Sequence, residues 1–132
     1  MNRIGMENVE GKEASIIITD TGGELTLKIM GEIDMDYSSM ILKPYISEFH
    51  EKISRAGIER IRLDLSELNF INSSGLKVFF WWMRLLDELP DDKNYSIALY
   101  YSTDITWQEC NVEIMQDLAP RLLELVTAPS RS

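Results

Sequence analysis

The sequence predicts an α/β fold, a small mixed β-sheet with α-helices packed against it. Three observations carry this prediction: an N-terminal hairpin pattern, an alternation of strand-like and helix-like segments after it, and a length that suits one domain. The 132 residues are 45% hydrophobic, which is sufficient for one core of ordinary size. We expect residues 14–126 to form the domain, residues 1–13 a flexible lead-in and residues 127–132 a flexible tail.

The hairpin is indicated by two apolar segments that flank a turn. Residues 15–19 are mostly β-branched, and residues 24–30 alternate between polar and apolar side chains. The intervening Asp20-Thr21-Gly22-Gly23 has the chemistry of a turn between antiparallel strands.

The next segment, from about Ser38 to Arg55, has helical periodicity. Its apolar face is formed by Leu42, Tyr45, Ile46, Phe49 and Ile53. Pro44 fits the first turn of a helix but not its interior. We therefore expect the regular helix either to begin near Leu42 or to kink at Pro44.

Strand and helix patterns then alternate along the middle of the chain. Residues 60–66 predict a third strand, and residues 68–71 a short connector with apolar anchors. A second helix is expected from about Ser74 to Leu89, where Pro90 ends it. Residues 95–101 are rich in β-branched and aromatic side chains and predict a fourth strand.

The last third predicts one more helix. Thr106 and Glu109 match a capping box, with Thr106 as the N-cap. We expect Pro120 to break or restart this helix, and Leu122 and Val126 to continue its apolar stripe. The strands joined through helices favour parallel crossover connections.

Composition excludes some function classes. There are 22 Asp and Glu residues against 13 Lys and Arg, which gives a net charge of −9. Such a chain repels phosphate backbones and anionic membrane surfaces, so we expect no nucleic-acid or membrane partner. Its N-terminal segment has no apolar run typical of a signal peptide and no stretch resembles a membrane span, so we expect a cytoplasmic protein. Bulk acidity is best explained by solubility, although it also suits a basic protein partner.

The most informative segment is Asn72-Ser73-Ser74-Gly75, which follows a strand pattern and opens a helix. Taken alone, this tetrapeptide is good capping and turn chemistry. A phosphate on a serine here would add about −1.5 to −2 charges to an exposed loop, so it could change partner binding without rebuilding the domain.

In this context the segment resembles the hallmark of the STAS domain, the fold of bacterial anti-sigma-factor antagonists and of sulfate-transporter tails. Residues 30–34 (Met-Gly-Glu-Ile-Asp) are similar to the Gly-Glu-Leu-Asp that follows the family's second strand. The resemblance extends from about Ser15 to Val126, although the final third matches in pattern only.

The resemblance implies a non-enzymatic protein ligand that acts by partner switching. A serine kinase that is also the anti-sigma factor would phosphorylate Ser73, or with less weight Ser74, and a phosphatase would reset the cycle. Asp34, Asn72, Ser73, Ser74 and Gly75 would contact the partner. No cofactor is implied, and we expect a monomer or a weak homodimer.

One departure leaves an alternative open. The family's usual Asp before the two serines is Asn72 here. Asn caps and turns as well as Asp does, but the fixed negative charge beside the acceptor is lost. The alternative is a STAS-like module that regulates another partner, such as a diguanylate cyclase, or that senses a small ligand, in either case without phosphorylation.

Other residues have simpler explanations. The aromatic run Phe79-Phe80-Trp81-Trp82-Met83 is expected to be core, with a partner surface as the alternative. His50 is expected to be a solvated surface residue, and Cys110 a packed one. A hydrolase would need Ser73 activated by His50, and nothing in the sequence places them together. A lone His and a lone Cys predict no metal site.

Overall fold

The computed structural model describes residues 2–128. Its elements in chain order are β1 (Val9–Glu10), β2 (Ala14–Asp20), β3 (Leu25–Ile33), α1 (Met35–Tyr37), the π-helical turn η1 (Ser38–Leu42), α2 (Lys43–Ala56), β4 (Arg60–Asp64), β5 (Leu68–Ile71), α3 (Ser73–Glu88), β6 (Ser96–Tyr101), α4 (Thr106–Leu118) and β7 (Leu123–Thr127).

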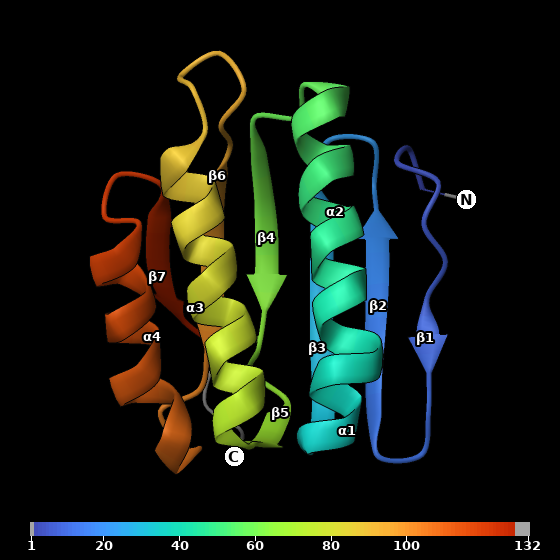
Figure 1. The fold of residues 1–132 in the computed structure, drawn as a ribbon, viewed down its shortest axis with the longest axis vertical. Coiled ribbons are helices and arrows are strands. Elements are labelled where there is room, and N and C mark those ends of the chain that lie inside the picture. Colours follow the sequence, from blue (N-terminus) through green and yellow to red (C-terminus); the bar gives the residue numbers. More distant parts are fainter. Residues whose placement is uncertain (1, 129–132) are drawn as a thin grey trace.

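The strands form one mixed sheet, as the sequence predicts. Its order is β1-β2-β3-β4-β6-β7, and β5 pairs with β3 beside β4. The first three strands are antiparallel, whereas β3, β4, β6 and β7 are mutually parallel neighbours. The helices all lie over one face of the sheet (Figure 1), so the chain has two layers with the core between them.

The segment before residue 14 contributes to this fold. Ile4 and Met6 are buried in the core, and Val9 pairs with Ile16 across the β1–β2 ladder. At the other end, β7 extends to Thr127 and Ala128 donates its N–H to the Tyr101 carbonyl. Residues 129–132 of the expected tail lie outside the described residues.

Pro44 occupies the first turn of α2, where its missing N–H is tolerated. The preceding turn, η1, is π-helical, and Lys43 N–H donates to the Ser38 carbonyl five residues back. The prediction that the regular helix begins near Leu42 is therefore confirmed.

Two expectations for the last third are wrong. Thr106 is the first residue of α4, and its N-cap is Ile105, which makes no side-chain cap bond. The residues after Pro120 form the parallel strand β7, not a helix. The physical reason is that α4 ends at Leu118, and Leu123 and Leu125 alternate so that both pack on the core beneath the helices.

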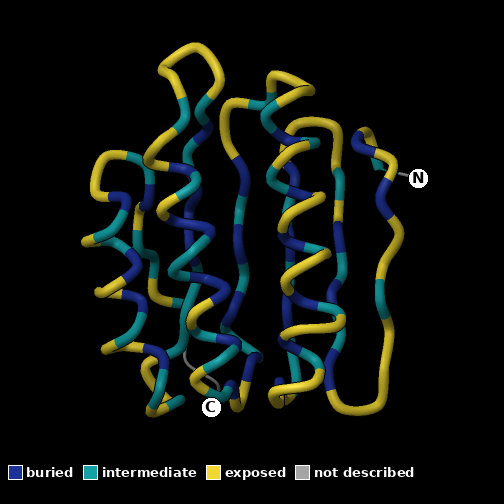
Figure 2. Tube along the Cα trace, in the orientation of Figure 1, coloured by how far each residue is buried: buried dark blue, intermediate teal, exposed yellow. Residues whose placement is uncertain are grey.

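Buried residues follow the inner sides of the helices and strands (Figure 2). Within the aromatic run, Phe79, Trp82 and Met83 are fully buried, while Phe80 and Trp81 are partly buried against the core. Trp82 contacts Phe49 of α2 edge-to-face, with ring centroids 5.9 Å apart. The core interpretation of this run is therefore confirmed.

Candidate functional site

The first turn of α3 is built by Asn72. Its Oδ1 accepts a hydrogen bond from Gly75 N–H at 2.9 Å, and its own N–H donates to the Ile33 carbonyl at 3.0 Å. Asn72 is therefore the N-cap that the tetrapeptide predicts. Ser73 follows as the first helical residue, with an exposed side chain.

Asp34 and Asn72 belong to adjacent loops joined through Ser38. The exposed Asp34 caps α1 by accepting from Tyr37 N–H at 2.9 Å. Its carbonyl accepts from Ser38 Oγ at 2.8 Å, and that hydroxyl lies 3.4 Å from Asn72 Oδ1. The structure therefore brings together the two loops that the sequence analysis singled out.

Gly75 has a steric role in this arrangement. A Cβ at this position would lie 2.5 Å from the Ile71 side chain and 3.0 Å from Ser38 Oγ. Only a residue without a side chain lets β5, η1 and α3 approach this closely. Gly75 is buried, so it shapes the loop from beneath rather than presenting a contact surface.

Exposed apolar side chains flank these loops, and sequence reasoning missed them. Met35 directly follows Asp34 and is 64% exposed, and Met40 in η1 is 74% exposed. Phe70 of β5, expected as an anchor, is 51% exposed, whereas Ile71 is buried as expected. The three apolar residues stand out only once the sheet shows which side of each segment the helices cover.

A notch of about 300 Å³ opens beside the two serines, between the η1–α2 segment and α3. It is lined by Ser38, Ser39, Lys43, Ser74, Lys77, Val78 and Trp81. The Lys43 ammonium lies 5.1 Å from the centre of the Trp81 ring, within the range of a cation–π contact. Ser73 and Ser74 therefore have different surroundings, solvent for Ser73 and this notch for Ser74.

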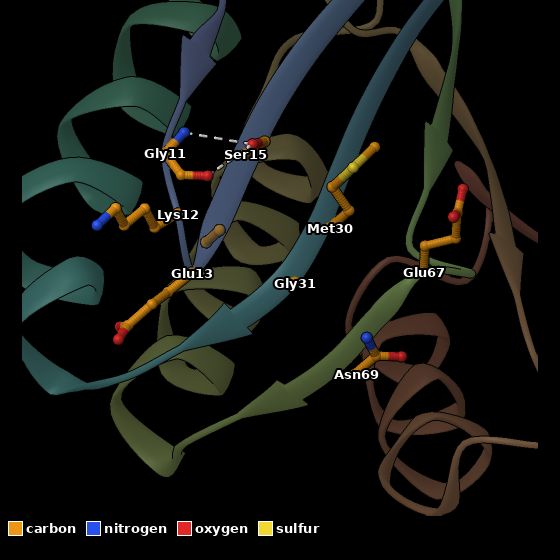
Figure 3. Close-up of a pocket in the computed structure, with 9 residues that line it drawn as sticks. Gly11, Lys12, Glu13, Ser15, Met30, Gly31, Glu67 and Asn69 are labelled. Atoms are coloured by element: carbon orange, nitrogen blue, oxygen red, sulfur yellow. Dashed lines mark hydrogen bonds between the residues drawn. The ribbon is translucent and has the colours of Figure 1, made fainter.

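The segment resembling the family's Gly-Glu-Leu-Asp has a structural explanation. Gly31 has φ +96°, and a Cβ there would lie 2.0 Å from the Glu13 carbonyl oxygen. It sits at a bulge where β3 changes its register with β5. A hollow of about 320 Å³ lies beside it on the face of the sheet away from the helices, with Glu67 and Asn69 opposite (Figure 3).

His50 is not the solvated residue that the sequence predicts. Its Nδ1 lies 2.7 Å from Tyr95 Oη, which accepts from Trp82 Nε1–H at 2.8 Å. The indole can only donate, so Tyr95 Oη is the acceptor of that bond, while the direction of its bond to His50 Nδ1 depends on the imidazole tautomer. Burial lowers the pKa of His50, opposed by the charge of Glu51, and raises the pKa of Tyr95.

This network separates His50 from Ser73. Trp82 is nine residues along α3 from Ser73, about 13 Å at the helical rise. His50 is hydrogen-bonded at the Trp82 and Tyr95 end, so it is not positioned as a base for Ser73.

Cys110 is exposed rather than packed, because it lies on the outer side of α4. Within residues 2–128, no group of three or more His, Cys, Asp or Glu side chains is arranged to hold a metal ion. None of the helices in this described range is long and apolar enough to cross a membrane.

No family model matches the chain, and no curated protein matches it. Solved structures do. An anti-sigma factor antagonist from Mycobacterium paratuberculosis superposes with a TM-score of 0.59 and 18% identity, covering 88% of this chain and 89% of that one. SiaC of Pseudomonas aeruginosa superposes with a TM-score of 0.65 and 17% identity, covering 93% of this chain and 100% of that one.

A third structure is the Pseudomonas aeruginosa diguanylate cyclase SiaD in complex with its activator SiaC, with a TM-score of 0.61, 17% identity and the same coverage. At these identities the likeness is one of fold. The chain therefore has a STAS-like fold that resembles the anti-sigma-factor antagonists, as the sequence analysis expects.

Proposed function

We propose that this chain is a regulatory protein ligand without catalytic activity of its own. It binds a partner protein through the surface formed by Asp34, Asn72, Ser73 and the flanking apolar residues. The observation that carries the proposal is the exposed Ser73 hydroxyl at the start of α3, beside a second loop held to it through Ser38.

The composition of this surface suits a partner rather than a substrate. Met35, next to Asp34, and Met40 of η1 expose large apolar side chains on the segments that follow the Asp34 cap. Exposed apolar residues that surround polar groups are typical of protein interfaces. The exposed carboxylate of Asp34 adds charge that can select a basic partner group.

Ser73 is the proposed switch. A serine kinase that is also the binding partner transfers a phosphoryl group to its Oγ, and a phosphatase removes it. The phosphate would place about −1.5 to −2 charges in the middle of an apolar interface, where it disfavours binding by repulsion and desolvation. The resemblance to an anti-sigma factor antagonist supports a kinase of that class as the partner.

The test combines site mapping with affinity capture. We expect mass spectrometry of the protein from its native cells to find phosphate on Ser73. We expect Ser73→Ala to retain the captured partner and Ser73→Asp to lose at least tenfold of it. Ser47→Asp, an exposed residue of α2, adds the same charge elsewhere and should behave as wild type. Capture that is equal for both Ser73 variants would contradict the switch.

A second candidate partner is a signalling enzyme that the chain binds without phosphorylation. It is favoured by the likeness to SiaC, described as the activator of a diguanylate cyclase, and by the absence of the family's usual Asp at Asn72. Capture that is abolished by Met35→Asp but unaffected by Ser73→Asp would favour this candidate over the phosphorylation switch.

A further inference from the structure

The two serines of the α3 loop face different surroundings. Ser73 is exposed, whereas Ser74 is half-buried and forms part of the notch between η1–α2 and α3. The α3 wall of this notch consists of Ser74, Lys77, Val78 and Trp81, which share one helical face because they are spaced i, i+3, i+4 and i+7. The opposite wall includes Ser39 and Lys43, also one turn apart.

The charge of the notch is opposite to that of the chain. The protein carries 22 acidic residues against 13 Lys and Arg, yet the lining includes Lys43 and Lys77 and no carboxylate. Contact with the Trp81 ring positions the Lys43 ammonium at the notch. Ser39 adds an exposed hydroxyl to the lining, whereas the buried Ser38 hydroxyl already donates to the Asp34 carbonyl.

The geometry points to Ser74 as a second phosphorylation position, whose phosphate Lys43 and Lys77 bind within the same chain. This inference rests on the proposed function only for the kinase that delivers the phosphoryl group. In that step the Ser74 oxygen forms a bond to the terminal phosphorus of a nucleoside triphosphate. The bond from that phosphorus to its bridging oxygen breaks, and the nucleoside diphosphate and the hydroxyl proton leave.

Phosphorylation of Ser73 and phosphorylation of Ser74 would have different consequences. A phosphate on Ser73 projects into solvent, where a partner meets it. A phosphate on Ser74 joins Lys43 of α2 to Lys77 of α3 by charge-assisted hydrogen bonds, so it fastens the two helices together. A phosphate on Ser73 would therefore act on partner binding, and a phosphate on Ser74 would act on contacts within the chain.

The experiment installs phosphoserine at residue 74 or at residue 73 of the full chain during synthesis, which removes the need for a kinase. Thermal unfolding is measured for each form in three backgrounds: the native lysines, Lys43→Met with Lys77→Met, and Lys93→Met as a lysine control outside the notch. We expect phosphate at residue 74 to raise the melting temperature by about 2–4 °C. That rise should vanish in the double variant and persist in Lys93→Met.

Phosphorus NMR gives a second measurement, the second pKa of the phosphate, which depends on nearby charges and not on packing alone. Two nearby ammonium groups favour the dianion, so the second pKa of the phosphate at residue 74 should lie below that of the phosphate at residue 73. The difference should disappear in the double lysine variant. Equal pKa values, or a melting shift that ignores both lysines, would overturn the intramolecular site.

Mapping of the native protein separates this inference from the proposed function. Phosphate found at both serines supports both ideas. Phosphate found at Ser73 alone overturns Ser74 as a modification site and leaves the switch intact. A lysine-dependent pKa shift in the synthetic protein, with no phosphate on either serine in cells, overturns both phosphorylation proposals.

Discussion

The two halves of α3 hold their polar groups in contrasting ways. At its start, Ser73 is exposed, and the neighbouring loops are held by single hydrogen bonds that involve Asp34 and Asn72. In its later half, Trp82 is buried and donates to the buried Tyr95 ahead of β6, which is hydrogen-bonded in turn to His50 of α2. One helix therefore anchors the core at one end and presents an exposed serine at the other.

The contrast indicates how a small domain can carry a switch without losing its fold. Buried polar groups are costly to disturb, because a donor or acceptor that loses its partner cannot turn to water. Exposed ones can be exchanged or modified at little cost. We therefore expect substitutions of buried residues to lower stability at either end of α3, and substitutions of exposed residues at its start to leave stability nearly unchanged.

The largest effect is expected from Trp82→Ala. This change removes a fully buried indole, its contact with Phe49 and the donor to Tyr95. The free energy of unfolding should fall by about 3–5 kcal/mol. Denaturant titration measures it, with Trp81→Ala as the matched control, since Trp81 is only partly buried. Equal losses for the two variants would contradict the anchoring role of Trp82.

Gly75→Ala should come next, because it tests the start of α3 from beneath. The new Cβ would lie 2.5 Å from the Ile71 side chain, so β5 or the helix must shift. We expect a loss of about 1–3 kcal/mol in the free energy of unfolding. Ser74→Ala, one residue earlier, removes only a hydroxyl that makes no core contact and should change stability by less than about 0.5 kcal/mol. A neutral Gly75→Ala would mean that the loops are not closely packed.

The burial of His50, which lowers its pKa, predicts that the free energy of unfolding depends on pH. The folded pKa of His50 is lowered, so between that value and about 6.5 the unfolded chain binds more protons. His50 therefore adds stability that is full above about pH 6.5 and is lost as pH falls toward the folded pKa. The limiting slope is about 1.4 kcal/mol per pH unit for one proton. We expect much less, because His50 is partly exposed and solvent screens it.

The comparison of wild type with His50→Gln isolates this slope, since Gln keeps an acceptor but does not titrate. The curves of unfolding free energy against pH should diverge as the pH falls below about 6.5. Asp20 does not interfere, because its pKa is held well below the usual range by the hydrogen bonds and charge of Arg3. Parallel curves would show that burial does not lower the pKa of His50.

Much of the fold follows from local pattern. The hairpin and the three longer helices have strong periodicity, and the Asn72 cap is recognisable because a polar capping residue stands between a strand and an apolar run. β7 was harder to predict. Its apolar residues, Leu123, Leu125 and Val126, are compatible with either a strand period or a helix period. Only the pairing with β6 shows that the segment is a strand. Thr106 failed as a cap because the capping pattern occurs one residue inside the helix.

The polar residues of the candidate site can be predicted from the sequence, but the residues that contact them in the fold cannot. Asp34 and Asn72 were found by motif, yet their neighbour Ser38 was not, since its contact spans 34 residues of sequence. The same holds for His50, whose partner Tyr95 is 45 residues away. Burial of His50 and exposure of Met40 depend on which side of α2 and of η1 faces the sheet. The spacing of apolar residues in the sequence gives that side only approximately.

The smallest effect is expected from Asn72→Asp, which introduces the residue usual in the motif that residues 72–75 resemble. Asp caps as well as Asn does, and its charge adds a favourable interaction with the N-terminal end of α3. We expect the free energy of unfolding to rise by about 0.3–1 kcal/mol at pH 7, and the gain to disappear below about pH 4, where the carboxyl is protonated.

Asn69→Asp is the matched control for this change, because Asn69 is exposed on β5 and adds the same charge away from the helix. Denaturant titration at pH 7 and pH 3, in low and high salt, distinguishes the two variants. A gain confined to residue 72 and screened by salt places the effect at the cap of α3. Equal shifts at both positions would attribute it to net charge alone. In the first case the cap of α3 is not optimised for the stability of the fold.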